Sequence, residues 1–226
     1  MLAGICLMYG SVHAQTTNLL FDRKSDFGIS AGLVGSGEVS MDFDPYVTKK
    51  NASFFIKGFY DSYMIPKLST GLYVQIMPAS VNLHDTWTEV EPEYVNGEWI
   101  YPEREITESY DIGVFIWEIG ASIKTKYFLG KSWAMKPGLN MGYRKFYFNE
   151  DDLKAADVLW LFESEDQKPR AAGMAINGSV EFQYRYSEKM ILSSEVGFMT
   201  QPYGGTHHVT DLDFGPILYI ALGVVR

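Results

Sequence analysis

Apolar and polar residues alternate along eight stretches of this chain, and long and short connectors alternate strictly between them. Because successive residues of a β-strand point to opposite faces, alternation with a period of two predicts half-buried strands. The predicted strands are residues 27–36, 52–60, 67–77, 112–127, 133–148, 172–186, 190–200 and 214–225. The long connectors are 37–51, 78–111, 149–171 and 201–213, and the short ones are 61–66, 128–132 and 187–189. This pattern predicts an all-β fold, an eight-stranded antiparallel up-and-down transmembrane β-barrel with short periplasmic turns and long extracellular loops.

The composition of the two strand faces predicts which of them meets lipid. Glycines collect on the polar face, which suits the narrow interior of an eight-stranded barrel: Gly28, Gly32, Gly71, Gly120, Gly138, Gly142, Gly197 and Gly223. Aromatic residues gather where the strands meet the short turns, as in an interfacial girdle: Tyr60, Tyr127, Phe128, Trp133, Tyr184 and Tyr186. We therefore expect the apolar face to point outward, and not into a core as in a soluble lipocalin-like barrel.

The N-terminus predicts export from the cytoplasm. An apolar stretch at residues 2–8 is followed by Val12-His13-Ala14, which predicts a signal peptide over residues 1–14. Residues 15–26 would then be a periplasmic segment and residues 27–226 the barrel, in the outer membrane of a Gram-negative-type cell. The single cysteine, Cys6, lies in the signal region, so the mature chain has no disulfide, thiol nucleophile or cysteine-bound zinc.

The distribution of charge narrows the choice of partners. The net charge is −9, and the long connectors hold most of the 28 acidic residues and a minority of the 19 basic ones. Nucleic acid is not an expected partner for loops of this sign. Outer-membrane lipid, divalent cations at the acidic loops and the cation-bridged lipopolysaccharide surface are the expected ones.

The first predicted strand reads Phe27-Gly28-Ile29-Ser30-Ala31-Gly32-Leu33. With the topology, it resembles the first strand of the PorT-like outer-membrane β-barrel family, and the chain is similar to the small barrels typified by the OmpA transmembrane domain, OmpX and OmpW. The resemblance covers about residues 25–226 and rests on topology more than on identities. It implies an outer-membrane barrel, and its OmpW-like branch implies a narrow path for small or hydrophobic solutes.

The predicted inward face carries ionisable side chains, which must pair because an isolated buried ion is costly. These residues are Lys57, Glu118, Lys124, Lys126, Lys136, Arg144, Glu181, Arg185 and Glu195. They predict a lumen plugged by salt bridges. The alternative is a conducting pore whose excess positive charge selects anions.

Histidines give little support for catalysis. The mature chain has only His84, His207 and His208, and a triad of His207, Ser109 and Asp211 does not have the closely spaced His and Ser of lipid A deacylases. We therefore predict no catalytic residue, no metal ligand and no cofactor. A lipid-modifying enzyme is the third reading, after a surface-interaction or envelope-stability protein and a narrow porin-like path.

The second long connector carries the strongest local signal. Asn96-Gly97 between β-forming residues predicts a type I′ hairpin, because both residues accept a positive φ. Trp87, Trp99 and Tyr101 accompany it among seven glutamates. Two readings stay open, a solvated acidic cap and a stalk that recruits a protein partner by strand addition.

In the third long connector, Asn149 is the predicted cap of a short helix within residues 153–162. Such a helix would lie on the lipid surface, cover the barrel mouth as a lid, or pack against the other loops.

Overall fold

The computed structural model describes residues 23–41, 47–156, 170–204 and 212–226. Several predictions therefore lie outside the described residues: the signal peptide, most of the segment 15–26, and the C-terminal part of the predicted helix in the third connector. His207, His208 and Asp211 lie outside them as well.

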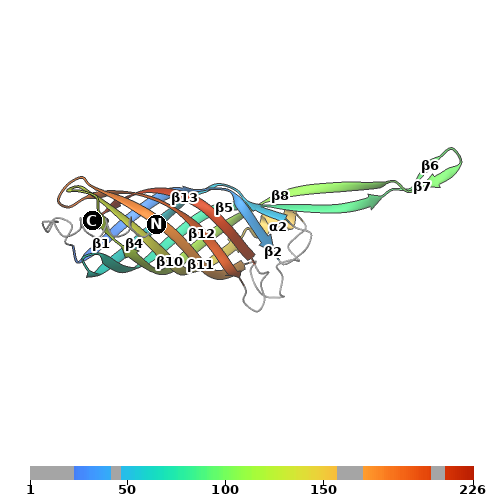
Figure 1. The fold of residues 1–226 in the computed structure, drawn as a ribbon. Helices are drawn as coiled ribbons and strands as arrows, with labels where there is room; N and C mark the ends of the chain where they lie inside the picture. Colours follow the sequence, from blue (N-terminus) through green and yellow to red (C-terminus); the bar gives the residue numbers. More distant parts are fainter. Residues whose placement is uncertain (1–22, 42–46, 157–169, 205–211) are drawn as a thin grey trace, which may run out of the picture.

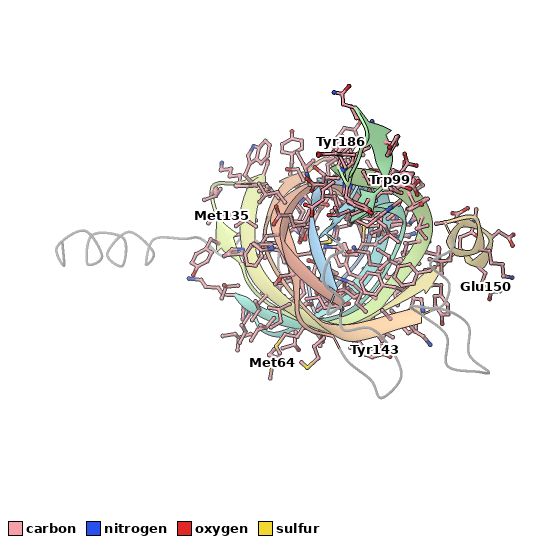
Figure 2. The ribbon with its side chains drawn as sticks, turned by 90° about the vertical axis from the view of Figure 1, so that its right-hand side faces the viewer. Met64, Trp99, Met135, Tyr143, Glu150 and Tyr186 are labelled. Atoms are coloured by element: carbon pink, nitrogen blue, oxygen red, sulfur yellow. The ribbon has the colours of Figure 1, made fainter. Side chains whose placement is uncertain are left out.

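Eight strands form a closed antiparallel ring (Figures 1 and 2). In ring order they are β1 (Ser25–Val34), β4 (Ser53–Ile65), β5 (Leu68–Val90), β8 (Glu103–Thr125), β10 (Trp133–Phe148), β11 (Arg170–Arg185), β12 (Ile191–Gly204) and β13 (Leu212–Val225). The ring closes where β13 pairs with β1, from Gly28↔Val225 to Val34↔Tyr219. The predicted fold class is confirmed.

The two faces of the barrel wall differ in exposure as the alternation predicts. In β1, the side chains of Phe27, Ile29 and Leu33 point outward and are more than half exposed, whereas Ser30 and Val34 point inward and are buried. Large apolar side chains cover the outside of every strand of the ring. A continuous apolar belt of this kind is far larger than the patches that soluble monomers expose, and it suits a lipid environment. Among the described residues, no helix is long and apolar enough to cross a membrane.

The two ends of the barrel differ in the length of their connections, and we call them the turn end and the loop end. At the turn end, β4 and β5 are joined by residues 66–67, and β9 (Tyr127–Phe128) lies in the turn before β10. At the loop end, β2 (Gly37–Met41) and β3 (Val47–Lys50) form a hairpin that lengthens the wall, because β2 pairs with β13 and β3 with β5.

The connector predicted over residues 78–111 is mostly strand. β5 and β8 stay paired from Leu68↔Thr125 to Val90↔Glu103, and the hairpin leaves the barrel as a stalk (Figure 1). A second, short hairpin of β6 (Glu93–Val95) and β7 (Glu98–Ile100) forms its tip. The β5–β8 ladder thus continues past the boundary that loss of apolar alternation predicted, since both faces of a two-stranded ribbon in water accept polar side chains.

The predicted cap of the short helix is present. In α2 (Glu150–Ala155), the Asn149 side chain accepts a hydrogen bond from the backbone N–H of Asp151. The helix lies beside β8, where the Gly113 N–H donates to the Asp152 carboxylate at 2.8 Å. Leu153 is fully buried and joins the interior apolar cluster. The burial of Leu153 thus holds the helix against the loop end of the barrel, next to the end of β10.

The interior of the barrel has two halves of different chemistry. The loop-end half is an apolar cluster that includes Val34, Phe55, Met77, Leu83, Ile112, Ile116, Phe146, Met199 and Ile217. Buried charged and polar side chains occupy the turn-end half and the middle. The candidate site includes the charged groups of the turn-end half and the middle.

Candidate functional site

Six buried ionisable side chains form a compact group in the turn-end half, the turn-end charge cluster: Asp26, Asp61, Lys124, Lys126, Lys136 and Glu181. Asp61 lies at its centre and accepts hydrogen bonds from Lys124 at 2.9 Å and from Lys136 at 3.0 Å. Lys136 also donates to Asp26 at 3.3 Å. Since three cations face three carboxylates, the cluster is neutral as a group.

The hydroxyl groups of one tyrosine and one serine complete the turn-end charge cluster. The Tyr63 hydroxyl donates to Asp26 at 2.5 Å and accepts from Lys126 at 3.1 Å. Ser122 donates to Asp61 at 3.1 Å. Buried charges that have this many partners rigidify the part of the barrel they fill.

Asp26 and Asp61 were missing from the residues predicted by sequence. β1 begins at Ser25 and β4 runs to Ile65, whereas the predicted strands began at residue 27 and ended at residue 60. The signal was present, because Asp26 lies two residues before inward Gly28 and Asp61 lies two residues after inward Phe59. Extending the alternation by one step at the turn end would have found both carboxylates.

A second group lies in the middle of the lumen and joins four strands. Arg144 donates to Glu118 through Nε at 2.8 Å and Nη2 at 2.6 Å. Glu118 also accepts from Asn177 at 2.6 Å and from the Tyr73 hydroxyl. A tightly paired charge of this kind has little tendency to bind a passing ion.

Inward glycines provide the space for this group. A Cβ atom added to Gly120 or to Gly142 would lie 2.7 Å from the Tyr73 hydroxyl oxygen. Because a real Cβ atom does not approach another atom so closely, these two positions must be glycine for Tyr73 to reach Glu118. The predicted role of inward glycines in a narrow barrel therefore has a specific structural cause here.

A third interior ion pair stands beside the second group. Lys57 donates to Glu195 at 2.5 Å, and the Tyr219 hydroxyl donates to the other oxygen of Glu195 at 2.5 Å. Glu195 is also the direct cross-strand neighbour of Glu181. Two like charges opposite each other are tolerated because Lys57 contacts Glu195 and Lys124 lies 3.6 Å from Glu181.

The structure thus brings eight of the nine predicted lumen residues into buried ion pairs. Arg185 differs, since it is only half-buried at the turn end of β11 and these pairs do not include it. With Asp26 and Asp61 added, five buried carboxylates face the five buried cations of these pairs. The excess of positive lumen charge expected from the nine predicted residues is therefore not found among these paired side chains.

Lys50 is a further buried cation, beyond the apolar belt at the loop end. Its ammonium donates to the backbone oxygen of Asn51 at 2.9 Å and to the Ser53 hydroxyl at 2.8 Å. Burial, and to a smaller extent the positive charge of Arg144, lowers the pKa of Lys50 to about 8. The side chain ties together the break between β3 and β4.

The stalk presents the aromatic residues that the sequence singled out. Asn96 and Gly97 have φ values of 53° and 92°, as a type I′ turn requires. Trp99 is 61% exposed and its ring centroid lies 5.1 Å from that of Tyr94, while Tyr101 is 64% exposed. Figure 2 labels Trp99 on the hairpin that Figure 1 shows projecting beyond the ring.

The joint between the stalk and its tip is acidic. Pro92 and Pro102 lie between the two ladders, where a missing N–H prevents the β5–β8 ladder from continuing into β6 and β7. A cleft of about 400 Å³ lies at this joint and is lined by Glu89, Glu91, Glu93, Pro102, Glu103, Arg104 and Glu105. No group of metal-ligating side chains in metal-binding geometry was found in the described part of the chain.

Ser109, which the sequence analysis considered with His207, contacts His84 instead. The hairpin register places Ser109 opposite His84, and the Ser109 hydroxyl lies 2.8 Å from His84 Nδ1. No carboxylate is hydrogen-bonded to His84 among the described residues. The pair lies at the base of the stalk near Asn82 and Asp111, beyond the outward apolar belt.

Comparison with known proteins finds solved structures of similar fold. No family model matches the sequence, and no curated protein matches it. The outer membrane protein OprG from Pseudomonas aeruginosa is similar in structure at 12% identity, with a TM-score of 0.54, over 90% of this chain and 97% of that one. Neisserial surface protein A is similar at 10% identity and a TM-score of 0.46, over 88% of this chain and 95% of that one. Ail of Yersinia pestis, in complex with a heparin analogue, is similar at 11% identity and a TM-score of 0.38, over 89% and 99%.

The likeness to OprG, together with the closed ring, shows that the chain has the fold of a small eight-stranded outer-membrane β-barrel. Two parts of the molecule bear on its function, the interior and the stalk. The interior is filled by paired charges and apolar side chains, which favour closure. The stalk exposes aromatic and acidic groups, which favour binding.

Proposed function

We propose that this chain is an outer-membrane protein whose closed barrel holds an acidic, aromatic-tipped stalk outside the cell for interaction with another protein. The turn end would face the periplasm and the loop end the exterior, as in barrels with short periplasmic turns. The apolar belt supports the membrane location, and the fold shared with OprG is consistent with it.

The observation that carries this proposal is the continuous pairing of β5 and β8 beyond the wall. The last residue of β5 that pairs with a neighbour other than β8 is His84. Six further pairs, from Asp85↔Glu108 to Val90↔Glu103, extend the hairpin by about 20 Å before the tip begins. An ordered ribbon of this length is more than a loop needs to stay soluble.

The stalk has the chemistry of a protein-binding edge. Exposed aromatic side chains supply much of the binding energy at protein interfaces, and Trp99 and Tyr101 stand on the tip. The edge of β5 from residue 85 to residue 90 pairs with no second strand among the described residues, so its backbone groups are open to strand addition. The glutamates around it favour a partner with basic side chains.

The test is site-specific photo-crosslinking on intact cells. A photoreactive phenylalanine analogue replaces Trp99, and a control replaces Lys49, an exposed residue of the β2–β3 hairpin. We expect a discrete protein adduct from position 99 and none from position 49. Changing Glu91 and Glu93 to Lys should lower the yield about tenfold, because attraction to a basic partner becomes repulsion. The absence of a discrete adduct at position 99, or identical adducts from both positions, would refute the proposal.

A second candidate is a narrow path for small apolar solutes. The apolar loop-end half of the interior favours it, because it offers apolar surface at the outer mouth. The turn-end charge cluster opposes it, since a solute would have to break buried ion pairs to reach the periplasm. We therefore rank it below the stalk.

A further inference from the structure

The lipid-facing belt contains one charge. The belt consists of the outward residues of segments 27–33, 54–64, 70–78, 115–123, 133–147, 174–184, 192–200 and 218–224. Among the described side chains of these positions, only Lys145 is charged. It lies three residues before the loop-end terminus of β10, at the outer margin of the belt.

Aromatic rings surround Lys145. Its ammonium lies 5.0 Å from the ring centroid of Tyr147, and its cross-strand neighbour on β8 is Trp117. Trp117 in turn packs edge to face against Tyr143, with 6.0 Å between ring centroids. Tyr143 lies on the outer surface of the barrel (Figure 2).

Among the described residues, Lys145 has no salt-bridge partner. Within the described part of the chain, every ion pair joins interior side chains, and none involves Lys145. Its side chain is half-buried. A lysine at the edge of a lipid-facing surface extends its stem so that the ammonium reaches the headgroup level, where Trp and Tyr also concentrate.

We propose that Lys145, with Trp117, Tyr143 and Tyr147, binds a phosphate of a phosphorylated glycolipid in the outer leaflet. A sugar phosphate monoester carries about −1.5 to −2 charges at neutral pH, more than the single charge of a phospholipid diester, and so is attracted more strongly to a lone ammonium. The flat aromatic faces beside it suit sugar rings and the first methylenes of acyl chains. The assignment to the outer leaflet rests on the orientation proposed above.

The test measures lipid retention by native mass spectrometry after release from nanodiscs. The nanodiscs contain phosphatidylcholine with either lipid A, lipid A stripped of its phosphates, or phosphatidylglycerol. The variants are Lys145→Gln, Lys145→Arg and a control, Lys49→Gln, which removes an exposed lysine outside the belt. Heat-dependent gel mobility verifies that each variant is folded.

We expect the wild type and Lys49→Gln to retain one lipid A, and Lys145→Gln to retain about fivefold to tenfold less. Lys145→Arg should restore retention, and removal of the phosphates should abolish the difference between variants. Equal retention by Lys145→Gln and the wild type would overturn the proposal, as would equal retention of phosphatidylglycerol and lipid A. Because nanodiscs expose both leaflets and contain no protein partner, this result does not depend on the stalk or on the orientation in cells.

Discussion

The two halves of the barrel interior exclude water by different means. In the turn-end half, Asp61 is held by Lys124 and Lys136, and each of these ions depends on the others. In the loop-end half, side chains such as Phe55, Leu83 and Phe146 are buried by contact alone. An alternating sequence requires a filled interior, but it does not specify whether ion pairs or apolar side chains fill it.

This difference determines how the stability of each half responds to amino-acid substitutions. Removing one member of a buried ion pair leaves an uncompensated charge, whereas removing both often costs little. An apolar core tolerates replacements that keep its volume. The charged half therefore depends on specific partners, and the apolar half depends on the space it fills.

The largest expected effect is the loss of a single charge from the middle of the lumen. Glu118→Leu leaves Arg144 buried without its carboxylate and should lower the free energy of unfolding by about 3 to 5 kcal/mol. Urea unfolding in phospholipid bilayers, followed by tryptophan fluorescence, measures it.

The matched control for that variant is the double change Glu118→Leu with Arg144→Leu. It removes both charges and leaves Tyr73 and Asn177 short of a hydrogen-bond partner, so it should be less destabilising than Glu118→Leu alone. A double variant at least as unstable as the single one would show that charge pairing does not govern this half.

A smaller effect is expected in the loop-end half. Leu83→Met keeps the volume of a side chain that is 2% exposed and should cost less than about 1.5 kcal/mol in the same urea experiment. A loss as large as that of Glu118→Leu would mean that the apolar half is as specific as the charged half.

The sequence predicted the ring and the inward face because strand alternation is a local property of the chain. The turn at Asn96-Gly97 could also be predicted, since a type I′ turn depends on two adjacent residues. Asp26 and Asp61 were missed because strand ends are set by pairing with neighbouring strands. The contact of Ser109 with His84 depends on the register of residues 25 positions apart, which alternation does not encode.

Two buried residues of the apolar loop-end half were missed for a related reason. Val81 and Leu83 fall in the segment 78–111, which was predicted as a connector, so their inward alternation was not counted. The β5–β8 ladder extends the barrel wall past the predicted strands and turns these residues into core. Local polarity indicates where a strand enters water, and not where it ends.

The most direct test of the closed interior is the conductance of the purified wild-type protein in planar lipid bilayers. We expect no steady open level, because five buried carboxylates pair with five buried cations across the lumen and apolar side chains fill its outer half. Insertion is verified in the same membranes by resistance of the barrel to added protease. A stable single-channel conductance, above all an anion-selective one, would contradict a closed interior.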